Sequence, residues 1–184
     1  CYSVDEDPIL AIHFEALAQA TQVEAIEPNF VPFPQANDLD KIIDLIVSFN
    51  DELSTKEGIA EYFEFDERQG DYYANAAIYL DFLGRGEARG RFTLTPLGQE
   101  LQRCKTRRCR NTLLLTQLFK RPTYRYSIKL LNNAQYNVDS VAIDDISDLI
   151  QQFDIRYNEV TRYRRASTVK SWLKWIHANI RFEE

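Results

Sequence analysis

Between residues 38 and 104 the sequence carries an ordered series of helix starts that leaves few folds open. An apolar stripe at helical spacing over 40–49 predicts a first helix. Ser54-Thr55-Lys56-Glu57 has the form of a capping box, with Ser54 as cap, and predicts a short second helix. Asp66-Glu67-Arg68-Gln69 is a second box and predicts a third helix, whose apolar positions recur every three or four residues. This series favours a small helical domain.

A glycine-rich stretch at 84–90 follows, and residues 91–95 then alternate between polar and apolar. This pattern predicts a β-hairpin. Thr95-Pro96 predicts the start of another helix, because proline suits the first helical position. The predicted elements follow the order of a winged helix-turn-helix: helix, short helix, turn, helix, hairpin and helix. We therefore expect a mainly α fold with a small β-hairpin.

The rest of the chain is predicted to be helical as well. Residues 1–37 read as an N-terminal extension or linker, with a short helix over 9–20. Residues 105–184 read as a helical region that follows the winged helix of 38–104. In this region we expect a basic helix over 106–119, a short strand within 138–143, a helix over 145–153 and a final helix capped by Ser167 or Thr168. The last two helices predict a second helix-turn-helix-like unit, which would make two in tandem.

Composition excludes several classes of function. No apolar run is long enough for a membrane span. Three cysteines are too few for a disulfide framework, so cytoplasm is the expected compartment. His13 and His177 stand alone in the sequence, and zinc needs three or four converging ligands. We expect no metal and no cofactor. The chain lacks an initiator Met and a signal-peptide pattern, and reads as a piece of a longer protein.

The net charge of −6 hides an uneven distribution. Residues 1–70 carry sixteen acids and three bases, whereas residues 85–130 carry twelve bases and two acids. Screening confines charge interactions to about 8–10 Å at physiological salt, so a local basic stripe matters more than the total. The basic stripe favours a polyanionic partner. The alternative is that the acidic and basic parts pair with each other or with a neighbouring domain.

A winged helix-turn-helix with basic stretches is typical of a DNA-binding protein. We expect its contacts with DNA to come from the third helix, the hairpin and the final helix. In a helix-turn-helix the second helix enters the major groove, where Arg, Gln and Asn read base edges. Tyr79 is expected on the outer face of that helix as well, while Glu67 and Asp71 there would repel phosphate. The predicted contacts are Arg68, Gln69, Tyr72, Asn75, Arg85, Arg89, Arg91, Arg162, Arg164, Arg165, Ser167, Thr168, Lys170, Ser171 and Lys174.

No motif predicts catalysis in this chain. The glycine-rich loop lacks the Lys-Ser/Thr ending of a phosphate-binding loop. Ser171-Trp172-Leu173-Lys174 has the spacing of serine acylases but none of their companion motifs. Two histidines give no Ser/His/Asp grouping. The run 103–110 holds five cations in eight residues, which suits either a solvated face or a phosphate or acidic partner.

Three segments resemble the winged-helix accessory domains of bacterial type II restriction endonucleases and related DNA-modification proteins. They are Ile59-Ala60-Glu61-Tyr62-Phe63, the stretch from Arg68 to Leu80 that contains Arg-Gln-Gly-Asp-Tyr-Tyr, and Phe92-Thr93-Leu94-Thr95-Pro96-Leu97-Gly98. The stretch 161–176 is similar to the closing helix of such proteins. The resemblance covers 38–102 and 144–180. It implies recognition or positioning on double-stranded DNA for a nuclease domain in the same or a partner chain.

Two functions remain open at this point. The first is a DNA-binding module without a catalytic centre. The alternative is a protein–protein interaction or dimerisation module, including a homodimer, with Tyr62, Tyr72 and Tyr79 as anchors, because interfaces are rich in tyrosine.

Overall fold

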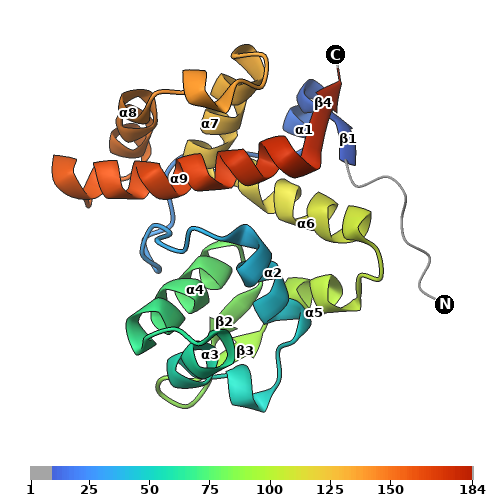
Figure 1. Cartoon of the computed structure of the whole chain (residues 1–184), viewed down its shortest axis with the longest axis vertical. Helices are drawn as coiled ribbons and strands as arrows, with labels where there is room; N and C mark the ends of the chain where they lie inside the picture. Colours follow the sequence, from blue (N-terminus) through green and yellow to red (C-terminus); the bar gives the residue numbers. More distant parts are fainter. Residues whose placement is uncertain (1–9, 184) are drawn as a thin grey trace. The chain divides into compact units, whose positions relative to one another are not determined.

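The structure, a computed structural model, describes residues 10–183. It is mainly helical, with two sheets of two strands each, and divides into two compact units (Figure 1). We call residues 28–104 the hairpin unit. We call residues 1–27 together with 105–184 the split unit, because the hairpin unit separates its two segments in the sequence. Within the described residues, no helix combines the length and the apolarity that a membrane crossing requires.

The hairpin unit contains a helix pair followed by a β-hairpin. Its elements are α2 (Leu39–Val47), the 3₁₀ turn η1 (Asp51–Leu53), α3 (Lys56–Phe63), α4 (Glu67–Tyr79), β2 (Leu83–Arg85), β3 (Phe92–Leu94) and α5 (Pro96–Arg103). Figure 1 shows α3 and α4 side by side, with β2 and β3 next to them. The strands are antiparallel, with Leu83 opposite Leu94. The helices and the hairpin predicted for this segment are confirmed.

Local capping explains where these helices begin. The Asp66 carboxylate accepts the Gln69 N–H at 2.8 Å, and the Thr95 hydroxyl accepts the Gly98 N–H at 2.9 Å. Each cap satisfies an N–H group that the first turn leaves without a helical partner. Both predicted starts are confirmed. The cap of α3 is Thr55, which accepts from Gly58, whereas Ser54 was expected.

The core of the hairpin unit is apolar and rich in rings. The side chains of Ile42, Leu45 and Ile46 on α2 are fully buried. On α4, Tyr73 and Tyr79 are also buried, and the Tyr79 ring meets Phe33 edge-on at 5.7 Å. The prediction that Tyr79 faces outward is therefore wrong. Phe33 lies in the extended segment before α2 and covers Tyr79. The periodicity of α4 cannot predict this contact, because Phe33 lies outside that helix.

The split unit is formed by both of its segments. Its elements are β1 (Leu10–His13), α1 (Phe14–Ala20), α6 (Arg107–Lys120), α7 (Pro122–Asn133), the 3₁₀ turn η2 (Val138–Ser140), α8 (Ile143–Phe153), α9 (Glu159–Asn179) and β4 (Ile180–Glu183). In Figure 1 the long helix α9 runs beside α7 and α8, and β4 continues from its end to lie next to β1. These two strands are parallel, with Leu10 opposite Ile180.

Three predictions for the split unit need correction. The predicted helix over 9–20 is a strand over Leu10–His13 followed by a shorter helix, because the strand pairs with β4 at the other end of the chain. The predicted strand within 138–143 is the turn η2, which Asn137 caps through the Asp139 N–H. The final helix does not begin at Ser167 or Thr168. Asn158 caps it nine residues earlier, by accepting the Thr161 N–H at 2.9 Å.

Arginine side chains hold the first segment of the split unit onto the second. The buried Arg121 guanidinium donates to the Glu24 carboxylate at 2.6 Å. Arg125 donates to the carbonyls of Ala18 and Thr21 from one side and of Phe119 from the other. Charged donors that satisfy backbone carbonyls contribute more than neutral ones. These two arginines are thus part of the structural framework of this unit.

Candidate functional site

The close approach of α3 and α4 sets the position of the outer face of α4. A Cβ placed on Gly70 would lie 2.2 Å from the Lys56 carbonyl oxygen, so only glycine allows this distance between the helices. The Lys56 ammonium lies 2.6 Å from the Glu67 carboxylate across the same helix pair. Their hydrogen bond raises the pKa of Lys56 and lowers the pKa of Glu67. One of the two acids expected to repel phosphate is thus neutralised within the unit.

The predicted base-reading residues of α4 interact with one another. The Arg68 Nε donates to the Tyr72 hydroxyl at 2.6 Å, which raises the pKa of Arg68, and the Arg68 guanidinium lies 5.6 Å from the Tyr72 ring. Asn75 Nδ2 donates to the Asp71 carboxylate at 3.3 Å. Arg68 is exposed, while Gln69, Tyr72 and Asn75 are half-buried. The outer face of α4 therefore presents one exposed cation and a set of partly accessible polar groups.

The hairpin presents three arginines without partners. Arg85 ends β2, and Arg89 and Arg91 lie in the turn before β3. All three are exposed, and no side-chain hydrogen bond or ion pair joins them to any residue of the described chain. The turn is closed by backbone bonds from Gly86 N–H to the Arg91 carbonyl at 2.8 Å and from Arg91 N–H to the Ala88 carbonyl at 3.1 Å. A compact backbone thus carries three free guanidinium groups.

A hollow of about 500 Å³ lies between this turn, the first turn of α3 and Asp71 of α4. Its lining mixes both signs of charge. The cations are Lys56, Arg85, Arg89 and Arg91, and the acids are Glu57, Asp71 and Glu87. The three hairpin arginines therefore border a hollow to which α4 contributes Asp71, and Arg68, Gln69, Tyr72 and Asn75 are not part of its described lining.

The arginines predicted on the final helix are placed differently from the expectation. Since α9 begins at Glu159, Arg162, Arg164 and Arg165 lie in its second turn and do not surround a helix N-terminus. Arg162 donates to the Tyr157 carbonyl at 3.0 Å, and the Arg165 guanidinium lies 5.2 Å from the Tyr157 ring. The predicted caps Ser167 and Thr168 therefore lie within the helix, and two of the three arginines pack against the preceding loop.

Some of the predicted α9 residues still share an exposed side. Arg164, Ser167 and Lys174 are exposed, Lys170 and Ser171 are half-buried, and Thr168 is buried. The two serine hydroxyls donate to backbone carbonyls one turn earlier, Ser167 to Tyr163 and Ser171 to Ser167. Arg164 and Lys174 are thus the accessible cations of this group.

The basic run 103–110 contains a feature that the sequence analysis did not expect. Lys105, Arg107 and Arg108 are exposed at the start of α6. Cys104 and Cys109 are both disulfide-bonded. Cysteine number alone indicated no disulfide framework, but it does not exclude a local bond between residues that the fold brings close together.

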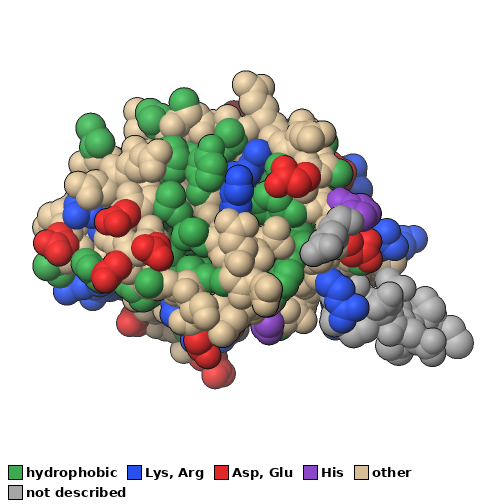
Figure 2. Space-filling model, turned by 90° about the horizontal axis from the view of Figure 1, so that it is seen from above, with side chains coloured by type: hydrophobic (Ala, Val, Ile, Leu, Met, Phe, Trp, Pro, Cys, Tyr) green, Lys and Arg blue, Asp and Glu red, His purple; other side chains and the backbone are tan. Residues whose placement is uncertain are grey.

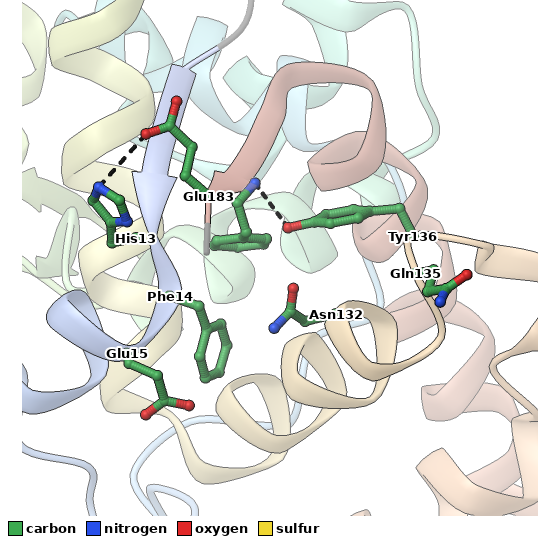
Figure 3. A pocket seen from close by; sticks show the side chains of 8 residues that line it. His13, Phe14, Glu15, Asn132, Gln135, Tyr136 and Glu183 are labelled. Atoms are coloured by element: carbon green, nitrogen blue, oxygen red, sulfur yellow. Dashed lines mark hydrogen bonds and ion pairs between the residues drawn. The ribbon is translucent and has the colours of Figure 1, made fainter.

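A hollow of the split unit involves residues that the sequence analysis did not select. It has a volume of about 590 Å³ and lies between β1, the end of α7 and β4 (Figure 3). Its lining residues are His13, Phe14, Glu15, Asn132, Gln135, Tyr136, Phe182 and Glu183. They come from three distant parts of the sequence, and the parallel strand pairing brings them together. No local motif could have identified them.

In the described part of the chain, no group of three or more His, Cys, Asp or Glu side chains is arranged to hold a metal ion. His13 pairs with Glu183 at 3.5 Å, and His177 lies beside Tyr136 with 6.4 Å between ring centroids. His13 and His177 thus each line a hollow that also includes Tyr136, and neither belongs to a set of metal ligands among the described residues.

Comparison with known proteins gives one match. Neither the curated proteins nor the solved structures contain a match to this chain. Residues 41–181 match the family model described as "Domain of unknown function (DUF7226)". This range includes α3, α4, the hairpin and most of the split unit, and it covers more than half of the chain. The protein therefore belongs to the DUF7226 family.

Proposed function

We propose that the hairpin unit is a winged helix-turn-helix that binds double-stranded DNA. The observation that supports this most is the group of three exposed arginines on the hairpin, Arg85, Arg89 and Arg91, which have no partner within the described chain. Guanidinium groups left without a carboxylate bind phosphate oxygens well, because their charge is not already compensated. The glycines of the turn allow a DNA backbone to come close.

The helix α4 would supply the contacts to bases. Arg68 is exposed at its start, and Gln69, Tyr72 and Asn75 are partly accessible on the same side. Arg, Gln and Asn are the side chains that recognise guanine and adenine edges in the major groove. To make these contacts, Arg68 must exchange Tyr72 for a base, and Asn75 must exchange Asp71. Sequence discrimination therefore costs the existing hydrogen bonds, whereas phosphate binding by the hairpin arginines costs none.

In this proposal the chain acts as a target-recognition or positioning module of a restriction-modification-type protein. The resemblance of Arg68–Leu80 and Phe92–Gly98 to winged-helix accessory domains supports this reading. A nuclease centre would then lie in another domain of the same or a partner chain, and this chain would not be an enzyme. Arg164 and Lys174 on α9 are candidates for additional phosphate contacts. The proposed compartment is the bacterial cytoplasm.

The test is DNA affinity as a function of salt. Fluorescence anisotropy with a mixed-sequence duplex between 50 and 200 mM salt should show affinity that falls as salt rises, because bound arginines release counterions. The triple variant Arg85→Ala/Arg89→Ala/Arg91→Ala should lower the slope of log K against log salt by about 3, since each phosphate contact contributes about 0.9.

Lys129→Ala serves as the control, because Lys129 is an exposed cation on α7 outside the proposed surface. Its slope should match that of the unmodified protein. Affinity that does not change with salt, or a triple variant that behaves like Lys129→Ala, would rule out phosphate binding by the hairpin.

A second candidate function is protein–protein interaction, and exposed apolar side chains of the split unit favour it. Ile155 is 93% exposed and Val160 is 64% exposed, and both lie where α8 passes into α9. The face drawn in Figure 2 likewise shows hydrophobic side chains in its middle, with acidic side chains gathered toward one end. The double variant Ile155→Ser/Val160→Ser should convert a dimer into a monomer in light scattering. A protein that is monomeric before the change would exclude homodimerisation through these residues.

A further inference from the structure

The outer side of α4 carries an acid among the residues that are proposed to contact bases. Residues three, four and seven positions apart share one side of a helix. On α4 this side is formed by Arg68, Asp71, Tyr72 and Asn75, whereas the opposite side, with Tyr73 and Ala77, is buried. A DNA groove that receives Arg68 would therefore also meet the Asp71 carboxylate.

No cation forms an ion pair with Asp71 among residues 10–183. Lys56 lines the same hollow as Asp71, but its ammonium lies 2.6 Å from the Glu67 carboxylate. The hydrogen bond to Glu67 is the largest cause of the raised pKa of Lys56, and Asp71 contributes least of the three acids that raise it. Asp71 thus places a carboxylate without an ion-pair partner on the outer side of α4.

The contact between Asp71 and Asn75 leaves the carboxylate as the accessible acceptor of the pair. Asn75 Nδ2 donates to Asp71 Oδ2 at 3.3 Å, while Asn75 Oδ1 is buried and accepts no hydrogen bond. Asparagine recognises adenine with its amide oxygen and nitrogen together, so Asn75 in this orientation does not offer both. Asp71 Oδ1 is not buried, and no described donor binds it. Asp71 can therefore accept from a base while it holds Asn75.

An ionised carboxylate accepts hydrogen bonds and donates none. In the major groove, cytosine presents an N4 amino group and adenine an N6 amino group, and both are donors. Guanine presents the acceptors O6 and N7, and thymine presents the acceptor O4. A carboxylate is therefore attracted to the first two bases and repelled by guanine, thymine and phosphate.

We propose that Asp71 is a specificity-determining residue of the DNA surface, and that it accepts from the amino group of a cytosine or an adenine. This inference rests on the proposed function. A duplex that places such an amino group beside the guanine contacted by Arg68 would satisfy both side chains. Any other duplex leaves the carboxylate against an acceptor, and a repulsive element of this kind is a common source of specificity.

The first test is the affinity of Asp71→Asn for a mixed-sequence duplex, measured by fluorescence anisotropy at one fixed salt concentration. The substitution removes the charge, keeps the shape and can still accept from Asn75. Because most sequences in such a duplex meet the carboxylate with acceptors, the affinity should rise about threefold, the size of one exposed charge interaction.

Asp44→Asn is the matched control. Asp44 is an exposed aspartate on α2 of the same unit, and it likewise accepts from neighbouring side chains, those of Ser48 and Tyr62. It lies outside the described lining of the hollow. Its substitution should leave the affinity unchanged. An equal rise in both variants, or no rise with Asp71→Asn, would overturn the proposal.

The second test is selection from a pool of randomised duplexes. The unmodified protein should enrich cytosine or adenine at one position about tenfold over guanine and thymine, within the range of a good side chain–base contact. Asp71→Ala, which offers no acceptor, should lose this preference, and Asn75→Ala should keep it. Loss in Asn75→Ala with retention in Asp71→Ala would assign the preference to Asn75 and contradict the proposal.

The salt dependence of the unmodified protein separates this inference from the proposed function. If the unmodified protein shows no salt-dependent binding to DNA, the proposed function fails, and the role of Asp71 fails with it. If it binds with the expected salt dependence but the Asp71 variants match it in affinity and base preference, the role of Asp71 alone is wrong.

Discussion

Three arginines of the split unit and the three arginines of the hairpin are used in opposite ways. In the split unit Arg121 is buried against Glu24, Arg125 binds three backbone carbonyls, and Arg162 binds the carbonyl of Tyr157. In the hairpin unit Arg85, Arg89 and Arg91 are exposed and bind none of the described residues. The same residue type thus stabilises the framework at one set of positions and is left available for a ligand at the other. A count of cations along the sequence cannot separate these roles, because the difference depends on which acceptors the fold brings within reach.

Among the substitutions that test this comparison, Arg121→Ala should have the largest effect on the free energy of unfolding. The substitution removes a buried guanidinium and leaves Glu24, which is half-exposed, without its partner. Loss of one member of a buried ion pair costs about 3–5 kcal/mol, and the partial exposure of Glu24 places the expected loss near about 3 kcal/mol. Urea denaturation measures it. Salt-dependent DNA binding should be unchanged under conditions in which the protein stays folded, and a stability change below about 1 kcal/mol would contradict a structural role for Arg121.

Tyr136→Phe extends the comparison to a tyrosine and should lower the free energy of unfolding by an intermediate amount. The substitution leaves the Phe182 N–H without its acceptor, at a cost of about 1 kcal/mol. Burial raises the pKa of Tyr136 to about 12, from the usual value near 10. The folded state therefore favours the neutral hydroxyl. The stabilisation is complete below pH 10 and is lost as the pH rises through 12.

The melting temperature should thus fall more steeply between pH 10 and 12 in the unmodified protein than in Tyr136→Phe. Tyr72, which binds the Arg68 side chain at the surface, provides the control. If Tyr72→Phe and Tyr136→Phe change the dependence of the melting temperature on pH equally, the hydrogen bond of Tyr136 to Phe182 does not contribute specifically to stability.

Arg89→Ala should have the smallest effect on stability. The side chain contacts no described partner, so the free energy of unfolding should change by less than about 0.5 kcal/mol, as for most surface substitutions. Any loss should appear in DNA affinity alone. Destabilisation by more than about 1 kcal/mol would mean that the hairpin arginines also belong to the framework, and the contrast between the units would disappear.

Short-range signals account for the parts of the fold that the sequence predicted. Asp66 and Thr95 cap α4 and α5 through bonds that span three residues, so their effect can be read from the sequence. Partners far apart in the sequence account for the errors. β1 is a strand because it pairs with Ile180–Glu183, and Tyr79 is buried because Phe33 covers it.

The candidate sites follow the same division. The hairpin arginines were predicted, because a turn between two short strands necessarily places them at the surface. The helix start near Arg162 was misplaced, because Ser167 and Thr168 have the residue types of a cap while Asn158 provides the actual one. The residues around Tyr136 were missed altogether, since no pattern in the sequence connects His13, Asn132 and Glu183.

The parallel pairing of β1 with β4 has a consequence for the order of assembly. On a ribosome the residues of the hairpin unit, 28–104, emerge before the second segment of the split unit, and they form a compact unit of their own. Strand β1 must wait for its partner, because β4 is made last among the described elements. Pairing β1 with β4 closes a loop that contains most of the chain, which costs conformational entropy and is slow. The hollow between β1, α7 and β4 is therefore expected to form late in synthesis, after the hairpin that carries the three arginines has formed.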